Sequence, residues 1–195
     1  MYKQKCTTGK VFVISGPSGV GKKTIIDEIL RNKTLNMIMS ISMTTRHMRE
    51  GEVDGKDYYF RTRKYFEKEI ENDAFLEYSE FVGNYYGTPK KYIYDAIGRG
   101  QNVLLEIDVV GYKNIRNNFD HGGIVSIFIA PPTLDVLRIR LMNRNTESHD
   151  DLIDRLAKAE LEMEMRYAYD FVVVNDKVDD AVRDVEAIIM NHIMP

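Results

Sequence analysis

The sequence Val11-Phe12-Val13-Ile14-Ser15-Gly16-Pro17-Ser18-Gly19-Val20-Gly21-Lys22-Lys23-Thr24 decides the fold of this chain. It begins with an apolar, β-branched run that predicts a buried strand. The segment that follows it has apolar residues at positions 25, 26, 29 and 30, which is the spacing of one helical face. In between, glycines allow backbone N–H groups to point at phosphate oxygens, and the N-terminus of the helix adds a favourable dipole. The stretch therefore predicts a phosphate-binding loop between a strand and a helix.

The residues after the loop glycines leave the role of a metal ion open. We expect Lys22 to reach the β- and γ-phosphates of a nucleoside triphosphate. The usual pattern continues with Ser or Thr, whose hydroxyl holds Mg²⁺, but this chain has Lys23 there and a hydroxyl one position later, in Thr24. Lys23 either adds a second ammonium near the triphosphate or points to solvent. The residues expected to bind the triphosphate are Gly16, Pro17, Ser18, Gly19, Val20, Gly21, Lys22, Lys23 and Thr24.

The composition is that of an ordinary globular protein, with 195 residues, 44% hydrophobic, 29% charged and a net charge of −3. A chain of this length predicts one compact unit that can carry inserted lobes. The charge balance gives no support for nucleic-acid binding, and no apolar run approaches the roughly 18 residues of a membrane span. We therefore expect neither a nucleic acid nor a membrane as partner.

The single cysteine, Cys6, cannot form an internal disulfide, so we expect a reducing, cytoplasmic setting.

Further apolar runs indicate the other strands of an α/β fold. They lie at residues 37–42, 102–108, 125–130 and 171–174. Helical patterns separate them, which predicts βαβ units and a parallel sheet flanked by helices.

Two segments differ from this βαβ pattern, and we expect a lobe and a lid there. In the segment at 43–92, residues 43–69 are rich in charge. Short strand patterns lie at 57–60 and 75–78, an amphipathic helix lies at 65–71, and a turn lies at 83–89. Residues 133–155 contain a helix at 134–141 and a polar turn at 143–151. We expect the first segment to be a substrate-holding lobe and the second a mobile lid. The core then comprises residues 9–42, 93–132 and 156–195.

Positive charge for phosphate groups comes from three distant parts of the sequence. Phosphoryl transfer requires mainly positioning and positive charge around the transferring group, and arginine binds phosphate oxygens bidentately. A single arginine is most often a solvated surface charge, but together with a phosphate-binding loop the set indicates phosphoryl transfer. These cations are Lys22 in the loop, Arg46 and Arg49 in the expected lobe, and Arg140, Arg144 and Arg155 around the expected lid.

Carboxylates and tyrosines suggest a metal site and an acceptor site. Asp108 ends an apolar strand, a position from which it can hold Mg²⁺ directly or through water. Glu77 and Glu106 follow apolar runs at the edge of the expected site, and a carboxylate suits the adjacent N–H donors that guanine offers and adenine does not. Tyr58 and Tyr86 could donate hydroxyls to a phosphate, although tyrosines in strands more often only pack.

With these residues assembled, the chain resembles the guanylate kinases over about residues 9–189. One motif alone would be weak evidence, whereas the ordered set is highly specific. The motifs are Ser15-Gly16-Pro17-Ser18-Gly19-Val20-Gly21-Lys22, Ser42-Met43-Thr44-Thr45-Arg46 with Arg49-Glu50-Gly51-Glu52, Gly55-Lys56-Asp57-Tyr58, Gly83-Asn84-Tyr85-Tyr86-Gly87-Thr88, Leu105-Glu106-Ile107-Asp108, Ile129-Ala130-Pro131-Pro132 and Val174-Asn175-Asp176. The resemblance implies a P-loop NTPase core, an inserted mixed α/β lobe that binds GMP, and a helical lid.

The resemblance also implies a reaction and roles for the residues that match. The reaction is transfer of the ATP γ-phosphoryl to GMP, and to dGMP, with Mg²⁺ as cofactor, by a monomer or homodimer. The GMP phosphate would be held by Arg46, Arg49, Tyr58 and Tyr86, with Glu52 orienting the arginines. Guanine would be read by Ser42, Glu77, Thr88, Glu106 and Asp108. The transferring phosphoryl would be surrounded by Lys22, Arg140, Arg144 and Arg155, with Asn175 near the adenine.

Two departures from the family pattern and two alternative functions stay open. Lys23 stands where many members have Ser and others Gly, and Asn145 replaces a glycine that is usual in the lid turn. One alternative is a catalytically silent guanylate-kinase-like module that binds proteins, against which the retained Lys22 and arginine set argue. The other is a P-loop kinase of another acceptor, or an ATPase. The carboxylates Glu77 and Glu106 favour guanine over these.

Overall fold

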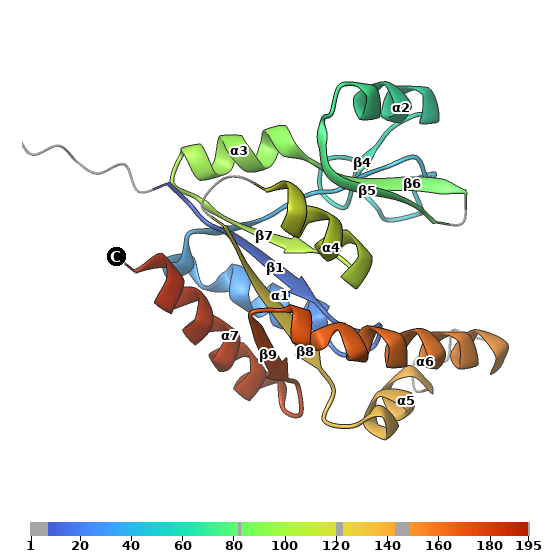
Figure 1. The fold of residues 1–195 in the computed structure, drawn as a ribbon, viewed down its shortest axis with the longest axis vertical. Helices are drawn as coiled ribbons and strands as arrows, with labels where there is room; N and C mark the ends of the chain where they lie inside the picture. Colours follow the sequence, from blue (N-terminus) through green and yellow to red (C-terminus); the bar gives the residue numbers. More distant parts are fainter. Residues whose placement is uncertain (1–7, 82, 120–122, 143–148, 195) are drawn as a thin grey trace, which may run out of the picture.

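The computed structural model describes residues 8–81, 83–119, 123–142 and 149–194, and its centre is a five-stranded sheet in the order β2-β7-β1-β8-β9 (Figure 1). All neighbouring strands run parallel. This confirms the predicted α/β fold with a parallel sheet. The strands are β1 (Val11–Ser15), β2 (Met37–Met39), β7 (Asn102–Glu106), β8 (Ile124–Ala130) and β9 (Phe171–Val174).

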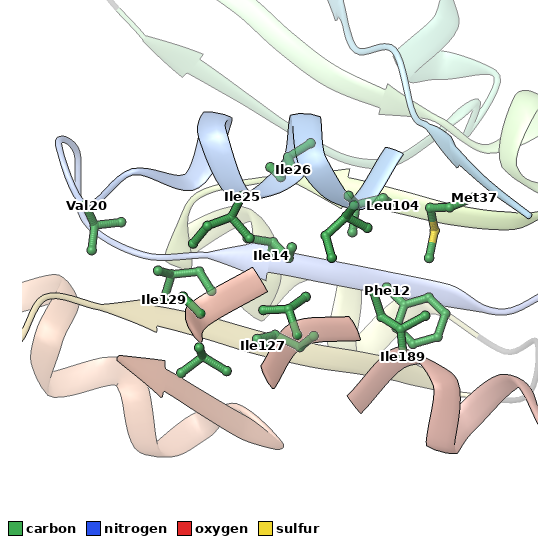
Figure 2. Close-up of a cluster of buried hydrophobic side chains, with 14 of the residues drawn as sticks. Phe12, Ile14, Val20, Ile25, Ile26, Met37, Leu104, Ile127, Ile129 and Ile189 are labelled. Atoms are coloured by element: carbon green, nitrogen blue, oxygen red, sulfur yellow. The ribbon is translucent and has the colours of Figure 1, made fainter. Parts of the chain in front are cut away.

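Helices cover both faces of this sheet, so its strands are apolar on both sides. On one face, Phe12 and Ile14 of β1 pack in a cluster with α1 (Lys22–Arg31) and α7 (Val178–Ile193), as Figure 2 shows. The opposite face of β1 packs with α3 (Lys90–Gly98) and α4 (Val109–Asn118). Burial on both faces explains why β1 is a continuous apolar run in the sequence.

The expected lobe contains a second, four-stranded sheet in the order β4-β3-β6-β5, seen at the upper right of Figure 1. Its strands are β3 (Met43–Thr44), β4 (Tyr59–Phe60), β5 (Phe75–Phe81) and β6 (Asn84–Pro89). Helix α2 (Arg63–Glu71) closes this small core, since its Phe66 stacks on Phe75 with ring centroids 4.4 Å apart. The lobe is therefore a packed unit with its own apolar cluster.

The predicted turn at 83–89 is wrong, because Asn84–Pro89 forms strand β6 between β3 and β5. Gly83, with φ 71°, makes the turn that precedes the strand. Gly87 serves packing, because a Cβ there would lie 2.9 Å from side-chain atoms of both Phe66 and Phe75. The glycine that suggested a turn thus lets the helix approach the strand.

Other boundaries also differ from the prediction. Strand β7 ends at Glu106, so Asp108 is the N-cap of α4 and does not end the strand as expected. The expected strand at 37–42 is shorter than predicted, since β2 ends at Met39 in the central sheet and the next strand, β3, starts at Met43 in the second sheet. The residues between them carry the chain from one sheet to the other. Helix α1 begins at Lys22 rather than at Ile25, directly after Gly21, whose φ is 98°. Lys22, which we expect to bind phosphate, is therefore in the first turn of the helix.

The expected lid region is helical where the structure describes it. Helix α5 (Leu134–Met142) matches the predicted helix, and Thr133 Oγ1 accepts a hydrogen bond from Val136 N at 3.2 Å. Helix α6 (His149–Glu164) starts inside the predicted turn at 143–151. Arg144 and Asn145 lie outside the described residues.

Short 3₁₀ turns follow α1 and α6, at Lys33–Leu35 and Met165–Ala168. None of the helices in the described ranges is long and apolar enough to cross a membrane.

Candidate nucleotide-binding site

The loop between β1 and α1 has the backbone of a phosphate cradle. Gly16, Gly19 and Gly21 have φ of 145°, 84° and 98°, which favour glycine over other residues. A Cβ on Gly16 would lie 2.2 Å from the carbonyl oxygen of Ile129, so the loop passes tightly beside the end of β8. The Lys22 ammonium donates hydrogen bonds to the carbonyl oxygens of Gly16, at 2.7 Å, and Pro17, at 3.2 Å. The cation is therefore held within the loop that is expected to receive phosphates.

The structure favours the solvent-facing alternative for Lys23. Its side chain is 86% exposed and its ammonium lies 3.5 Å from a carboxylate oxygen of Asp27, one helical turn further on. An exposed pair of this kind contributes little to stability. Thr24, the nearest hydroxyl to the usual metal position, is exposed beside it at the start of α1.

Asn175, which we expect near the adenine, lies directly against the cradle. Its side chain donates a hydrogen bond to the carbonyl oxygen of Val20 at 2.7 Å, and the residue is only 2% exposed. A Cβ on Gly21 would approach its amide nitrogen to 2.5 Å. The neighbouring Arg140 donates to the carbonyl oxygens of Asn175, at 3.0 Å, and Asp176, at 3.3 Å. The turn after β9 thus forms a hydrogen bond to the phosphate-cradle loop and accepts hydrogen bonds from one of the predicted arginines, Arg140.

A second predicted arginine reaches the cradle from helix α6. The guanidinium of Arg155 lies 3.4 Å from the hydroxyl oxygen of Ser18, 137 residues away in the sequence. The fold therefore brings Lys22 and Arg155 to the same loop. The third lid arginine, Arg144, is not among the described residues.

A cavity of about 510 Å³ lies between the carboxyl end of β7, the start of α4 and the second sheet. Its size suits a nucleotide-sized ligand. Six of its lining residues are ones that we predicted from sequence for the acceptor, namely Ser42, Tyr58, Glu77, Tyr86, Glu106 and Asp108. The others, which sequence reasoning missed, are Ser79, Glu80, Gly87, Ile107, Val110, Gly111 and Lys158.

Two carboxylates of this cavity are held in place by short hydrogen bonds. Thr88 donates from its hydroxyl to Glu77 Oε1 at 2.7 Å, and Gly111 N donates to Asp108 Oδ1 at 2.9 Å. Burial raises the pKa of Glu77, the hydrogen bond from Thr88 lowers it, and the Asp108 charge raises it. Because Glu77 Oε1 already accepts from Thr88, its Oε2 is the oxygen best placed to accept from a ligand. A Cβ on Gly111 would lie 3.3 Å from that Oε2.

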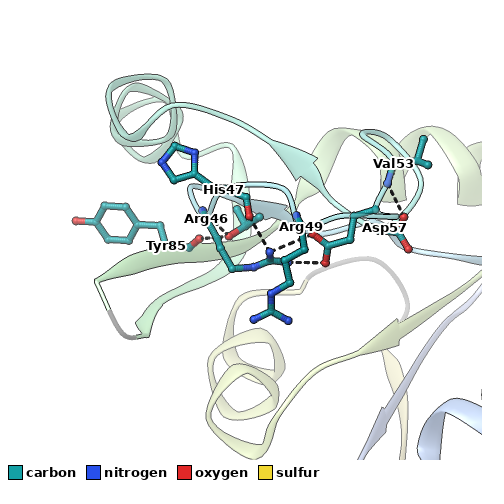
Figure 3. Close-up of polar contacts among 8 residues, drawn as sticks. Arg46, His47, Arg49, Val53, Asp57 and Tyr85 are labelled. Carbon is teal, nitrogen blue, oxygen red and sulfur yellow. Dashed lines mark hydrogen bonds and ion pairs between the residues drawn. The ribbon is translucent and has the colours of Figure 1, made fainter.

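The expected phosphate-binding arginine of the lobe is oriented by Glu52. Arg46 donates to both carboxylate oxygens of Glu52, at 2.7 and 3.0 Å, and to the carbonyl oxygen of His47 at 2.7 Å. Glu52 also accepts from Arg49 N at 2.7 Å (Figure 3). These bonds raise the pKa of Arg46 and lower that of Glu52, so both charges persist at neutral pH. The Arg49 guanidinium is exposed and points away from this network in Figure 3.

Aromatic rings connect this arginine to the cavity. The Arg46 guanidinium carbon is 5.5 Å from the centre of the Tyr58 ring, which meets the Tyr86 ring edge-on at 6.1 Å. Burial raises the pKa of Tyr58, so its hydroxyl stays protonated and can donate a hydrogen bond. Arg46, Tyr58 and Tyr86 thus form a continuous wall.

The residues fit the expected use of Mg²⁺ with one protein carboxylate. In the described part of the chain, no three His, Cys, Asp or Glu side chains converge as a metal cage. Mg²⁺ usually keeps several waters and takes one or two carboxylates together with substrate phosphates. Asp108 lines the cavity and is exposed, so it can fill that place.

Comparisons with known proteins agree with this geometry. The family model for guanylate kinase matches residues 8–192. The crystal structure of guanylate kinase from Anaplasma phagocytophilum is 33% identical, with a TM-score of 0.76, over 97% of this chain and 88% of that one.

Two more distant matches share the fold. TT1252 from Thermus thermophilus is 15% identical, with a TM-score of 0.52, over 96% of this chain and 100% of that one. A gluconokinase from Sinorhizobium meliloti 1021 is 14% identical, with a TM-score of 0.50, over 95% of this chain and 94% of that one. At such identities only the fold is comparable, whereas the match over residues 8–192 and the 33% identity concern the family itself. The chain therefore belongs to the guanylate kinase family of ATP:GMP phosphotransferases.

Proposed function

We propose that this protein transfers the γ-phosphoryl group of ATP to GMP, and to dGMP, giving ADP and the nucleoside diphosphate. The observation that carries the proposal is the pairing of two sites. A glycine-rich loop with Lys22 inside it lies at the end of β1, and a cavity lined by carboxylates lies at the end of the adjacent β7. Parallel strands present both sites at the same edge of the sheet.

On the donor side, the cradle would hold the triphosphate through backbone N–H groups and Lys22. The ammonium would exchange the carbonyl oxygens of Gly16 and Pro17 for β- and γ-phosphate oxygens. Arg155, already beside Ser18, would add positive charge at the transferring group. Arg140 and Arg144 are proposed for the same role, and Asn175 for support of the loop next to the adenine.

On the acceptor side, Glu77 would accept hydrogen bonds from the adjacent N–H groups of guanine. Thr88 supports it by fixing Oε1, and the other residues proposed to read the base are Ser42, Glu106 and Asp108. The GMP phosphate would be bound by Arg46, Arg49, Tyr58 and Tyr86, with Glu52 holding Arg46 before the ligand arrives. An arginine held in advance loses less conformational freedom on binding.

Asp108, directly or through water, and Thr24 would hold Mg²⁺, which when bound neutralises charge on the phosphates. The protein itself forms no covalent intermediate in this proposal. Its residues align an oxygen of the GMP phosphate with the γ-phosphorus of ATP and stabilise the charge that develops during in-line transfer.

We further propose that the chain moves as a core, a GMP-binding lobe at 43–92 and a lid at 133–155. The second sheet and its separate apolar cluster support the lobe as a unit. Stacking of Tyr59 of the lobe on Tyr92 of α3, at 4.8 Å, lies at its boundary with the core. Closure of lobe and lid would exclude water from the transfer.

The test is to assay ADP formation with ATP, Mg²⁺ and each of GMP, dGMP, AMP, CMP and UMP. We expect turnover with GMP and dGMP, and a loss of several orders of magnitude in Lys22→Ala. Turnover with AMP and not GMP would contradict the guanine site. ATP hydrolysis without any acceptor would indicate an ATPase, and no turnover at all would indicate a silent protein-binding module.

A further inference from the structure

Lys158 of helix α6 lines the acceptor cavity, and no expectation from the sequence included it. Its ammonium lies 4.0 Å from Asp108 Oδ2 and 3.7 Å from Glu162 Oε1. The lysine therefore lies between a carboxylate of the acceptor site and a carboxylate of its own helix. Its side chain is 57% exposed, so a ligand in the cavity has access to it.

The charged residues that line the cavity are mostly acidic, so a lysine among them changes its electrostatic potential. The acidic residues among its lining are Glu77, Glu80, Glu106 and Asp108, while Lys158 is the basic residue among the described lining residues. The proposed acceptor carries a phosphate dianion into this acidic surrounding. A cation in the wall reduces the repulsion between the carboxylates and that phosphate.

Glu162 of the same helix forms an ion pair with Lys158. It is only 6% exposed and lies one helical turn after Lys158, so the two side chains share a face of α6. Burial raises the pKa of Glu162, while the charges of Lys158 and Lys22 lower it. Lys22 of the cradle thus acts on the same buried carboxylate as Lys158. Charges of opposite sign thus alternate along Glu162, Lys158 and Asp108.

Asp108 is the residue of the acceptor site that Lys158 faces. Its Oδ1 accepts from Gly111 N at 2.9 Å, and its Oδ2 faces Lys158. With one oxygen held by the backbone of α4 and the other facing a cation of α6, the carboxylate has a defined orientation. Arg155 lies three residues before Lys158 and reaches Ser18, so α6 contacts both nucleotide sites.

We propose that Lys158 is a positioning residue of the acceptor site, which orients Asp108 and offsets the carboxylate charge for the incoming nucleoside monophosphate. The inference rests on the proposed function, since it concerns the same cavity. Helix α6 would then serve both nucleotide sites, the donor site through Arg155 and the acceptor site through Lys158.

The first experiment measures GMP binding by calorimetry without ATP, and the KM for ATP at saturating GMP. Lys158→Met keeps the length of the side chain and removes its charge. We expect GMP affinity to fall about five- to tenfold, the KM for ATP to stay within about twofold, and Lys158→Arg to restore affinity to within about twofold. Lys91→Met, at an exposed position of helix α3, is the matched control and should change neither quantity.

A double-mutant cycle with Asp108→Asn separates positioning from a general structural effect. If Lys158 acts through Asp108, Lys158→Met should weaken GMP binding less than about twofold in the Asp108→Asn background. An equal loss in both backgrounds, or an equal rise in the KM for ATP, would overturn the inference. So would unchanged GMP affinity in Lys158→Met when the wild type is active. Lack of GMP turnover by the wild type would overturn the proposed function, and the inference with it.

Discussion

Replacing Glu77 by Gln should damage the reaction while leaving the fold intact. Gln has the same shape, and its amide oxygen can still accept the hydrogen bond that Thr88 donates at 2.7 Å. The amide NH₂ then takes the place of Oε2 and faces the N–H donors of guanine. Two hydrogen bonds to a charged acceptor are lost, each worth about 1.5–3 kcal/mol, while the uncharged amide costs less to desolvate. The expected net loss is about 3–4 kcal/mol in transition-state binding, or about 10²–10³-fold in kcat/KM for GMP.

Whereas activity should fall, the free energy of unfolding of Glu77→Gln should be higher than that of the wild type at neutral pH. Burial raises the pKa of Glu77 in the folded protein, so its charged form opposes folding. A raised pKa contributes stability that is fully present below the unfolded-state pKa and is lost as pH rises through the folded-state pKa. The wild type should therefore lose stability relative to the variant over that window. GMP affinity should fall as pH decreases through the same raised pKa, because the ionised carboxylate is the acceptor.

The assay is steady-state kinetics with varied GMP, together with urea denaturation at several pH values. Glu71→Gln, at the exposed end of α2, provides a control for removing a carboxylate elsewhere. A change of less than threefold in kcat/KM, or a variant clearly less stable than the wild type at neutral pH, would refute the reasoning about Glu77.

Further predictions concern the cradle and the cavity wall. Asn175→Ala should cost about 1–3 kcal/mol in urea denaturation, because the buried carbonyl of Val20 loses its donor; an unchanged midpoint would contradict this. Lys23→Ser should keep kcat within about tenfold, since this lysine faces solvent, and a large gain would show that the missing hydroxyl limits the enzyme. Gly111→Ala should raise the KM for GMP about two- to tenfold without changing the KM for ATP, because its Cβ would lie 3.3 Å from Glu77; equal changes in both would be evidence against it.

The central sheet and the cradle could be predicted from the sequence because both have strong local signals. Strand β1 is buried on two faces and is a continuous apolar run, while β9 is an equally apolar strand at the edge of the sheet, and both have the predicted bounds. Strand β6 has no such signal, since its glycine and proline are typical of turns. Its conformation follows from pairing with β5 and from the approach of Phe66 to Gly87, which are contacts between distant parts of the chain.

The same limit applies to the site. Residues whose type suits the chemistry, such as Glu77 and Asp108, could be proposed from the sequence, and the fold places them around one cavity. Lys158 could not, because a Lys–Glu pair four residues apart on a helix is usually a solvated surface feature. Only the packing of α6 near the start of α4 brings that lysine to the acceptor. Likewise, the bond from Asn175 to Val20 joins residues 155 positions apart.

The order of strands in the central sheet has a consequence for synthesis on the ribosome. Strand β1 emerges first, but its two neighbours are β7 and β8, and β2 is separated from it by β7. Its apolar residues therefore have no partner strand until about 90 further residues are made, which takes about 5–20 s at common translation rates. During that interval helix α1 can cover Phe12 and Ile14, but α3 and α4, which cover the opposite face of β1, come much later in the chain. We expect chaperones, or local collapse onto α1, to shield this strand before the loop between β1 and α1 takes its final form.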